Sequence, residues 1–145
     1  MNPSEAPRHK VVGTVVCLPA RDLDTSVAFY KQVFDLPELA AEGGIIVVEL
    51  PNLSLFLIEE KEFESYSRKA GRGAQYPDAD VSVILSCAIA TREALDEMLD
   101  SVPRHGGRVV KQATMDEEMG LYLGYFFDPD GHHWEVAFSG ARDAG

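Results

Sequence analysis

The sequence predicts an α+β fold made of two modules that share one order of elements, β-α-β-β-β. The first observation is that an apolar, β-branched run leads into a helix pattern twice, over residues 11–34 and again over 81–102. The second is that short apolar runs separated by turn residues follow each helix pattern, as consecutive strands do. We expect one domain over residues 1–145, with module one at about 11–59, a connector at 60–80 and module two at about 81–138.

Module one is expected to open with a buried strand over residues 11–18, and Asp22 is a suitable cap for the helix that follows. Three further strands are predicted at residues 39–42, 45–50 and 53–58. In the connector, which is rich in charge and glycine, Phe63 and Tyr66 indicate one short helix.

Module two repeats this order with hardly any sequence identity. A strand is predicted over residues 81–89, and Thr91 is the expected helix cap. Three more strands are predicted at residues 108–112, 121–127 and 132–138. One face of each sheet is covered by its helix, so the two remaining faces either cover one another or leave a cleft.

The run FFDPDGHHWEV, residues 126–136, predicts two strands joined by a tight turn. Pro129 fixes φ and Gly131 tolerates positive φ, as such a turn requires. The second strand carries Glu135 among apolar and aromatic residues, and burying an unpaired carboxylate is costly. Glu135 therefore either lines a cavity that holds water or ligand, or has a bonding partner.

Composition excludes several classes of partner. A net charge of −11 argues against nucleic acid and anionic membrane surfaces, because no basic patch is available to replace counterions. No apolar run approaches the roughly 20 residues of a membrane helix, and residues 1–10 do not resemble a signal peptide. Cys17 and Cys87 have no CxxC spacing, so we expect a cytoplasmic protein with reduced thiols.

Two motifs carry a family resemblance. One is Leu18-Pro19-Ala20-Arg21-Asp22-Leu23 with Ser26, Phe29 and Tyr30, and the other is Asp128-Pro129-Asp130-Gly131-His132 with Trp134-Glu135-Val136. Over roughly residues 11–138 the chain resembles the vicinal oxygen chelate superfamily of glyoxalase I, bleomycin resistance proteins and extradiol dioxygenases. The resemblance implies that the modules form a curved, cup-shaped mixed sheet and that the protein is a homodimer. This fold hosts lyases, oxygenases, epimerases and binding proteins, so it does not fix the reaction.

Metal-dependent members of this superfamily hold a divalent ion with side chains from four strands. By the resemblance, those positions fall on Val15, Phe56, Ile84 and Glu135. Only Glu135 offers a donor atom, and His133 nearby does not make up the number that a divalent ion needs. We therefore predict neither a metal nor another cofactor.

Strand alternation predicts which side chains line the cup. The predicted ligand-binding residues are Val15, Cys17, Phe56, Ile84, Ser86, His133 and Glu135. Glu135 is the candidate catalytic residue, as a general base or as a counter-charge to a cationic ligand. The alternative for Glu135 is a carboxylate bonded to a backbone amide or to a neighbouring tyrosine.

Other side chains have less specific expectations. Cys17 is expected to be a small buried hydrophobic residue rather than a nucleophile. His132 is expected to be structural, and Trp134 to face away from Glu135 and to pack against a helix. Tyr122 and Tyr125 are expected on opposite faces of their strand.

Three functions are compatible with these observations. The first is a metal-independent small-molecule-binding protein of the glyoxalase/bleomycin-resistance type. The second is a lyase or dioxygenase of the same superfamily that uses Glu135 and a divalent metal. The third is a scaffold whose cup is plugged by Phe56 and its neighbours.

Overall fold

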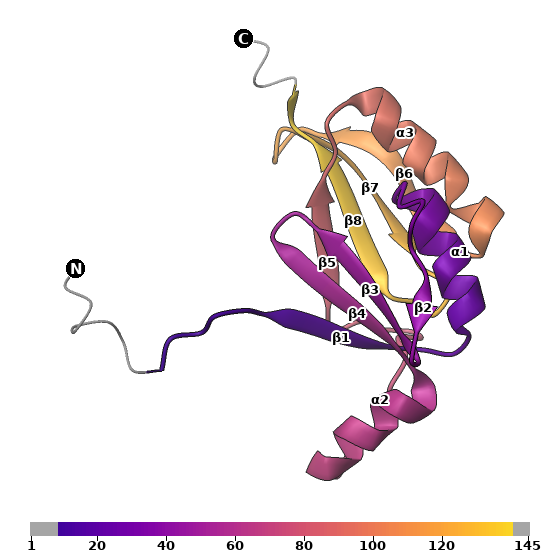
Figure 1. The fold of residues 1–145 in the computed structure, drawn as a ribbon. Helices are drawn as coiled ribbons and strands as arrows, with labels where there is room; N and C mark the ends of the chain where they lie inside the picture. Colours follow the sequence, from indigo (N-terminus) through magenta and orange to yellow (C-terminus); the bar gives the residue numbers. More distant parts are fainter. Residues whose placement is uncertain (1–8, 141–145) are drawn as a thin grey trace.

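The computed structural model, which describes residues 9–140, contains the two predicted β-α-β-β-β modules (Figure 1). Residues 1–8 and 141–145 of the predicted domain lie outside the described residues, and so does most of the polar segment at 1–10. Module one comprises β1 (Val15–Ala20), α1 (Leu23–Val33), β2 (Ala41–Glu42), β3 (Ile45–Leu50) and β4 (Leu53–Glu59). The connector forms α2 (Glu60–Ser67) and the 3-10 helix η2 (Arg68–Ala70). Module two comprises β5 (Ile84–Ala88), α3 (Arg92–Ser101), the 3-10 helix η3 (Pro103–His105), β6 (Arg108–Asp116), β7 (Leu121–Phe127) and β8 (His133–Phe138).

Both long helices begin where the sequence predicts. The Asp22 carboxylate accepts the backbone N–H of Asp24 at 3.0 Å, which caps α1. The Thr91 hydroxyl oxygen accepts the backbone N–H of Ala94 at 3.0 Å, which caps α3. Each bond satisfies one of the amide groups that have no partner inside the first helical turn.

The eight strands form two open, mixed sheets of four strands each. Sheet A has the order β1-β4-β3-β2 and sheet B has the order β5-β8-β7-β6. β1 runs parallel to its neighbour β4, and β5 runs parallel to its neighbour β8. The other neighbouring strands are antiparallel. The α+β fold class is thus confirmed. Within the described residues β1 and β5 each pair with one strand only, so each leaves a free edge.

Four strands differ by two residues or more in extent from the prediction. One is β2, which has only Ala41–Glu42 of the predicted residues 39–42. β1 begins at Val15 rather than residue 11 because its first pairing partner, Ser54, lies at the start of β4. β5 begins at Ile84 rather than residue 81 because β8 offers its first partner at His133. β6 continues to Asp116, beyond the predicted end at 112, and follows β7 through two irregularities in register.

The hydrophobic core joins the two modules. Helices α1 and α3 lie on the same side of the molecule (Figure 1), and α1 buries Phe29, Tyr30 and Val33. The ring of Trp134 on β8 is fully buried, 4.7 Å from the ring of Phe34 between centroids. The expectation that Trp134 packs against a helix is therefore confirmed. Aromatic contacts of Tyr30 and Phe34 with Trp134 bury one face of sheet B. We call the opposite, more exposed faces of the two sheets their concave faces.

No helix in the described part of the chain is long and apolar enough to cross a membrane.

Candidate functional site

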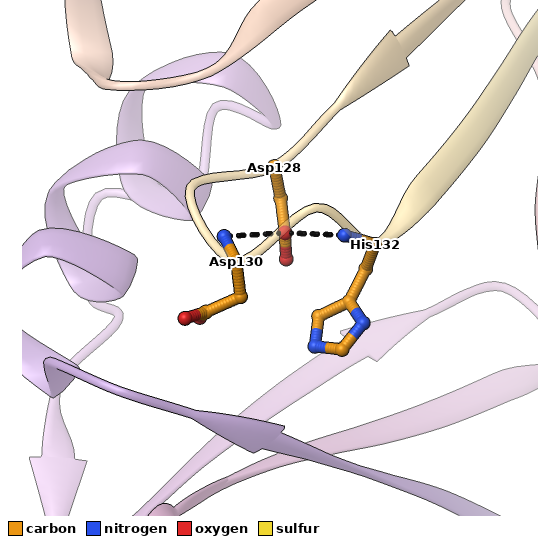
Figure 2. Close-up of side chains that lie close together, drawn as sticks. All are labelled: Asp128, Asp130 and His132. Carbon is orange, nitrogen blue, oxygen red and sulfur yellow. Dashed lines mark hydrogen bonds between the residues drawn. The ribbon is translucent and has the colours of Figure 1, made fainter. Parts of the chain in front are cut away.

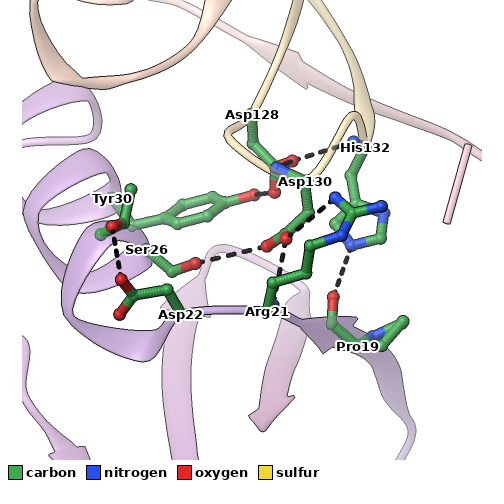
Figure 3. A network of polar contacts seen from close by, with 9 residues as sticks. Pro19, Arg21, Asp22, Ser26, Tyr30, Asp128, Asp130 and His132 are labelled. Atoms are coloured by element: carbon green, nitrogen blue, oxygen red, sulfur yellow. Dashed lines mark hydrogen bonds and ion pairs between the residues drawn. The ribbon is translucent and has the colours of Figure 1, made fainter. Parts of the chain in front are cut away.

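The two sequence motifs bond to one another where the modules meet. In the turn between β7 and β8, Asp128 Oδ1 accepts the backbone N–H groups of Asp130 at 2.9 Å and of His132 at 2.8 Å. Asp128 Oδ2 accepts the hydroxyl of Tyr30 on α1 at 2.6 Å. The carboxylate thus closes its own turn and fixes the turn to α1 (Figure 3).

Asp130 and His132 extend this contact to the end of β1. Asp130 accepts the backbone N–H of Arg21 at 3.0 Å and the hydroxyl of Ser26 at 3.4 Å. The Arg21 guanidinium also lies 3.5 Å from Asp130 Oδ1. His132 Nε2 lies 2.8 Å from the carbonyl oxygen of Pro19 and donates to it. We call this set the junction network: Pro19, Arg21, Ser26, Tyr30, Asp128, Asp130 and His132.

Burial governs the ionisation of Asp128 and Tyr30 in the junction network. Burial raises the pKa of the Asp128 carboxyl above its ordinary value. Burial, followed by the adjacent Asp128 carboxylate, raises the pKa of the Tyr30 hydroxyl well above its ordinary value. Trp134 Nε1 donates to the Tyr30 oxygen at 3.1 Å, so both sides of that hydroxyl are engaged.

Asp128, Asp130 and His132 are also the described residues whose ligand atoms gather closely enough to hold a metal, within 4.8 Å of one another (Figure 2). Hydrogen bonds already engage those atoms. Each oxygen of the two carboxylates accepts a donor, and His132 Nε2 is bonded to Pro19. A metal would have to displace most of these bonds, so the donor set fits a structural junction better than a metal centre.

Glu135 lies on the concave face of sheet B in a row of polar side chains. Ser86 on β5 lies opposite Glu135, and its hydroxyl donates to Glu135 Oε1 at 2.8 Å. Tyr125 on β7 lies opposite Glu135 on the other side, and its hydrogen bond to Glu135 raises the Tyr125 pKa. Lys111 on β6 lies opposite Tyr125. We call Ser86, Glu135, Tyr125 and Lys111 the polar row.

Sequence reasoning missed Lys111 in this row and did not single out Tyr125 from Tyr122. Alternation places Tyr125 and Glu135 on one face only when the register of β7 and β8 is known. Lys111 lies between two irregularities in the pairing of β6 with β7, which the sequence pattern does not reveal.

The corresponding row on sheet A is apolar. Cys17 on β1 lies opposite Phe56 on β4, which lies opposite Val47 on β3. Cys17 is exposed, so the expectation of a buried hydrophobic residue is wrong. Its strand is at the edge of the sheet, and its side chain is on the open face rather than toward α1.

The superfamily's four metal positions do not gather donors here. Val15 lies opposite Ser54, two residues along β1 from Cys17, and Ile84 lies opposite His133, two residues along β5 from Ser86. Both are exposed, at 44% and 56%. With Phe56 at the remaining position, Glu135 is the only one of the four positions whose side chain offers a ligand atom. The residues present therefore do not fit a divalent ion at these positions.

Two cavities lie on the concave face of sheet A. One of about 630 Å³ extends from the loop after α1 across β3, over Leu36, Leu39, Ile45, Val47 and Phe56. The other, of about 480 Å³, lies between the sheet and α2, among Cys17, Ile45, Phe56, Ile58, Phe63 and Tyr66. Both are of the size that small-molecule sites have.

The predicted ligand-binding residues do not share one of these cavities. Cys17 and Phe56 line the cavity beside α2. His133 lines a separate cavity of about 80 Å³ near Pro19. Ser86 and Glu135 bond to one another on the open face of sheet B.

Comparison with known proteins agrees with this architecture. A family model described as the Glyoxalase/Bleomycin resistance protein/Dioxygenase superfamily matches residues 12–136. Hypothetical protein SA1046 from S. aureus is similar with a TM-score of 0.75 and 25% identity, over 89% of this chain and 94% of that chain. A glyoxalase-related enzyme from Fulvimarina pelagi is similar with a TM-score of 0.72 and 22% identity, over 88% of each chain. The fosfomycin resistance protein FosX from Mesorhizobium loti has a TM-score of 0.63 and 13% identity, over 93% of this chain and 98% of that chain. No curated protein matches the chain.

Proposed function

The chain belongs to the glyoxalase/bleomycin resistance protein/dioxygenase superfamily, and we propose that it binds an organic small molecule on its concave face without the superfamily's divalent metal. The observation that carries this proposal is the set of side chains at the metal positions. Val15, Phe56 and Ile84 have no ligand atom, and a divalent ion needs several donors that converge on one point. A single carboxylate is too few.

The concave face supports an organic ligand in two ways. Sheet A contributes the cavities of about 630 Å³ and 480 Å³, which have mainly apolar walls. Sheet B contributes Glu135, which two hydroxyl groups hold in one orientation. Apolar walls with a few fixed polar groups are the usual composition of a small-molecule site.

Exposed strand edges, free thiols and net charge bear on the oligomeric state, the compartment and the partners of the protein. A homodimer would cover the free edges of β1 and β5, where Val15 and Ile84 are exposed. The free thiols of Cys17 and Cys87 support a reducing compartment such as the cytoplasm. The net charge of −11 supports the absence of a nucleic-acid partner. Light scattering after gel filtration measures the dimer directly.

The second candidate is a lyase or dioxygenase that uses Glu135 with a divalent metal. One observation favours it: Glu135 occupies the position of a metal ligand in the superfamily and is only partly buried. In this case Glu135 is the acid–base group or a ligand of the ion, and further donors come from the substrate.

Two measurements on protein purified without a chelator separate these candidates. Elemental analysis should find no stoichiometric zinc, nickel, iron or manganese. A thermal-shift screen should find organic compounds that stabilise the metal-free protein, because a ligand at 100 times its Kd adds about 2.7 kcal/mol. Stoichiometric metal on the concave face, or stabilisation that needs added metal, would favour the lyase or dioxygenase. A protein that no compound stabilises would favour the plugged scaffold.

A further inference from the structure

The two cavities over sheet A share part of their lining, so they form one trough. Ile45 and Phe56 line both of them. The loop after α1 forms one end of this trough, and Phe63 and Tyr66 of α2 form the other end. Its floor is the open face of β3 and β4, where Val47 lies beside Phe56. We use the word trough for these two cavities together.

The charges that line the trough have one sign. Glu38, Glu42 and Glu49 line the larger cavity, and no Lys, Arg or His lines either cavity. Within residues 9–140 the ion pairs join other residues, so none of the three glutamates is paired with a cation. Glu49 accepts a hydrogen bond from the Ser54 hydroxyl at 2.7 Å, which leaves its negative charge in place.

The other end of the trough is aromatic. Phe56, Phe63 and Tyr66 face the smaller cavity, and the Lys69 ammonium already lies over the Tyr66 ring, 5.7 Å from its centroid. Aromatic faces attract cations and also accept apolar groups. The glutamates are spread along the larger cavity, because Glu42 lies opposite Ile45 whereas Glu49 lies at the other end of β3. A cation in that cavity can therefore extend an apolar body over Phe56 toward α2.

From this arrangement we infer that the trough binds a small organic cation, with its ammonium or amidinium group in the larger cavity, which Glu38, Glu42 and Glu49 line, and its apolar body over Phe56. The inference rests on the proposed function, because it names the class of ligand that the concave face takes. Like charges around one cavity repel an anion, whereas a neutral ligand would cover the carboxylates without pairing them. A cation relieves both costs.

Three probes with the same apolar body test the sign of the charge. They are 4-phenylbutylamine, 4-phenylbutanol and 4-phenylbutanoate, and calorimetry measures the Kd of each. The amine should bind about tenfold more tightly than the alcohol, because each exposed ion pair adds only modestly to binding and three carboxylates act together. The butanoate should bind more weakly than the alcohol. Equal affinities for the three probes would overturn the inference.

A charge-matched pair of variants tests the location. The triple variant E38Q/E42Q/E49Q should weaken binding of the amine about tenfold and leave the alcohol within about twofold. The control is E93Q/E117Q/E118Q, which removes the same charge from exposed glutamates on α3 and the β6–β7 turn. The control should bind the amine like the wild type. An equal loss in both variants would mean that only net charge matters, and would overturn the inference.

The two cysteines give an independent readout of occupancy. Cys17 is exposed and lines the trough, whereas burial raises the pKa of Cys87 to about 11 and slows its reaction. The amine should slow alkylation of Cys17 by N-ethylmaleimide, measured by intact mass, and leave Cys87 unchanged. Binding of the amine without any protection of Cys17 would place it outside the trough.

The Glu135→Gln variant separates this inference from the proposed function. If that variant loses the amine while E38Q/E42Q/E49Q keeps it, the cation lies at the polar row, and the proposed function stands without this inference. If none of the three probes binds up to about 10 mM, the inference is overturned. If the thermal-shift screen also finds no ligand, the proposed function fails with it.

Discussion

Two carboxylates of module two each accept a hydrogen bond from a tyrosine, and they differ in what surrounds them. Asp128 is 3% exposed, and its oxygens accept the Tyr30 hydroxyl and two backbone N–H groups. Glu135 is only partly buried on the open face of sheet B, where it accepts hydrogen bonds from the hydroxyls of Ser86 and Tyr125. The same pair of chemical groups thus stabilises the fold where it is enclosed and remains accessible to a ligand where it is open.

The largest expected effect comes from removing the enclosed carboxylate. Asp128→Ala should lower the free energy of unfolding by about 3 kcal/mol or more, because it leaves the Tyr30 hydroxyl and two backbone N–H groups without a partner. Glu135→Ala, the matched control, should cost less than about 1 kcal/mol, since water replaces its hydroxyl partners. Urea denaturation measures both. Equal costs in the two variants would break the comparison.

The tyrosine partners should repeat this contrast on a smaller scale. Tyr30→Phe removes the donor to Asp128 and the acceptor of Trp134 Nε1, so it should cost about 2 kcal/mol. Tyr125→Phe should cost less than about 0.5 kcal/mol, because that hydroxyl lies at an open face. The same denaturation experiment applies. A Tyr125 variant as unstable as the Tyr30 variant would contradict the different roles of the two pairs.

Alkaline pH should weaken the enclosed pair. Burial raises the folded-state pKa of Tyr30 above the ordinary value of 10.0. The native state therefore holds the Tyr30 proton where the unfolded chain releases it, and stability falls as pH rises above about 10, by at most about 1.4 kcal/mol per pH unit. The advantage of the wild type over Tyr30→Phe should be complete below that pH and shrink above it. An advantage that stays constant from about pH 8 to about pH 11.5 would contradict this.

The largest effect on binding should accompany only a small effect on stability. Glu135→Gln should leave the free energy of unfolding within about 1 kcal/mol of the wild type, because an amide still accepts from Ser86 and Tyr125. Binding of the organic ligand found in the thermal-shift screen should be lost. Glu117→Gln, on the exposed β6–β7 turn, is the matched control and should bind normally. Unchanged affinity in Glu135→Gln would remove Glu135 from the site.

Sequence patterns located the features that depend on neighbouring residues. The caps at Asp22 and Thr91 depend on side chains within three residues of the helix start, so the sequence pattern can predict them. The turn that contains Pro129 is local for the same reason. The sequence also placed Glu135 on a strand face opposite to Trp134, because alternation has a fixed period of two.

Features that depend on residues far apart in the sequence could not be predicted from the sequence pattern. The exposure of Cys17 depends on what covers sheet A, and the trough depends on where α2 lies. The extent of β6 and the place of Lys111 depend on its register with β7. The bonds between the two motifs join residues about a hundred positions apart, such as Tyr30 and Asp128. Pairing over such separations is set by tertiary packing rather than by local pattern.

A calorimetric titration at two metal levels tests the proposed function most directly. The best organic ligand from the screen is titrated into protein dialysed against a chelator, and then into protein supplied with excess nickel or manganese. The account predicts the same Kd in both titrations, since Val15, Phe56 and Ile84 give an ion nothing to bind. Binding that appears only with the metal would contradict it.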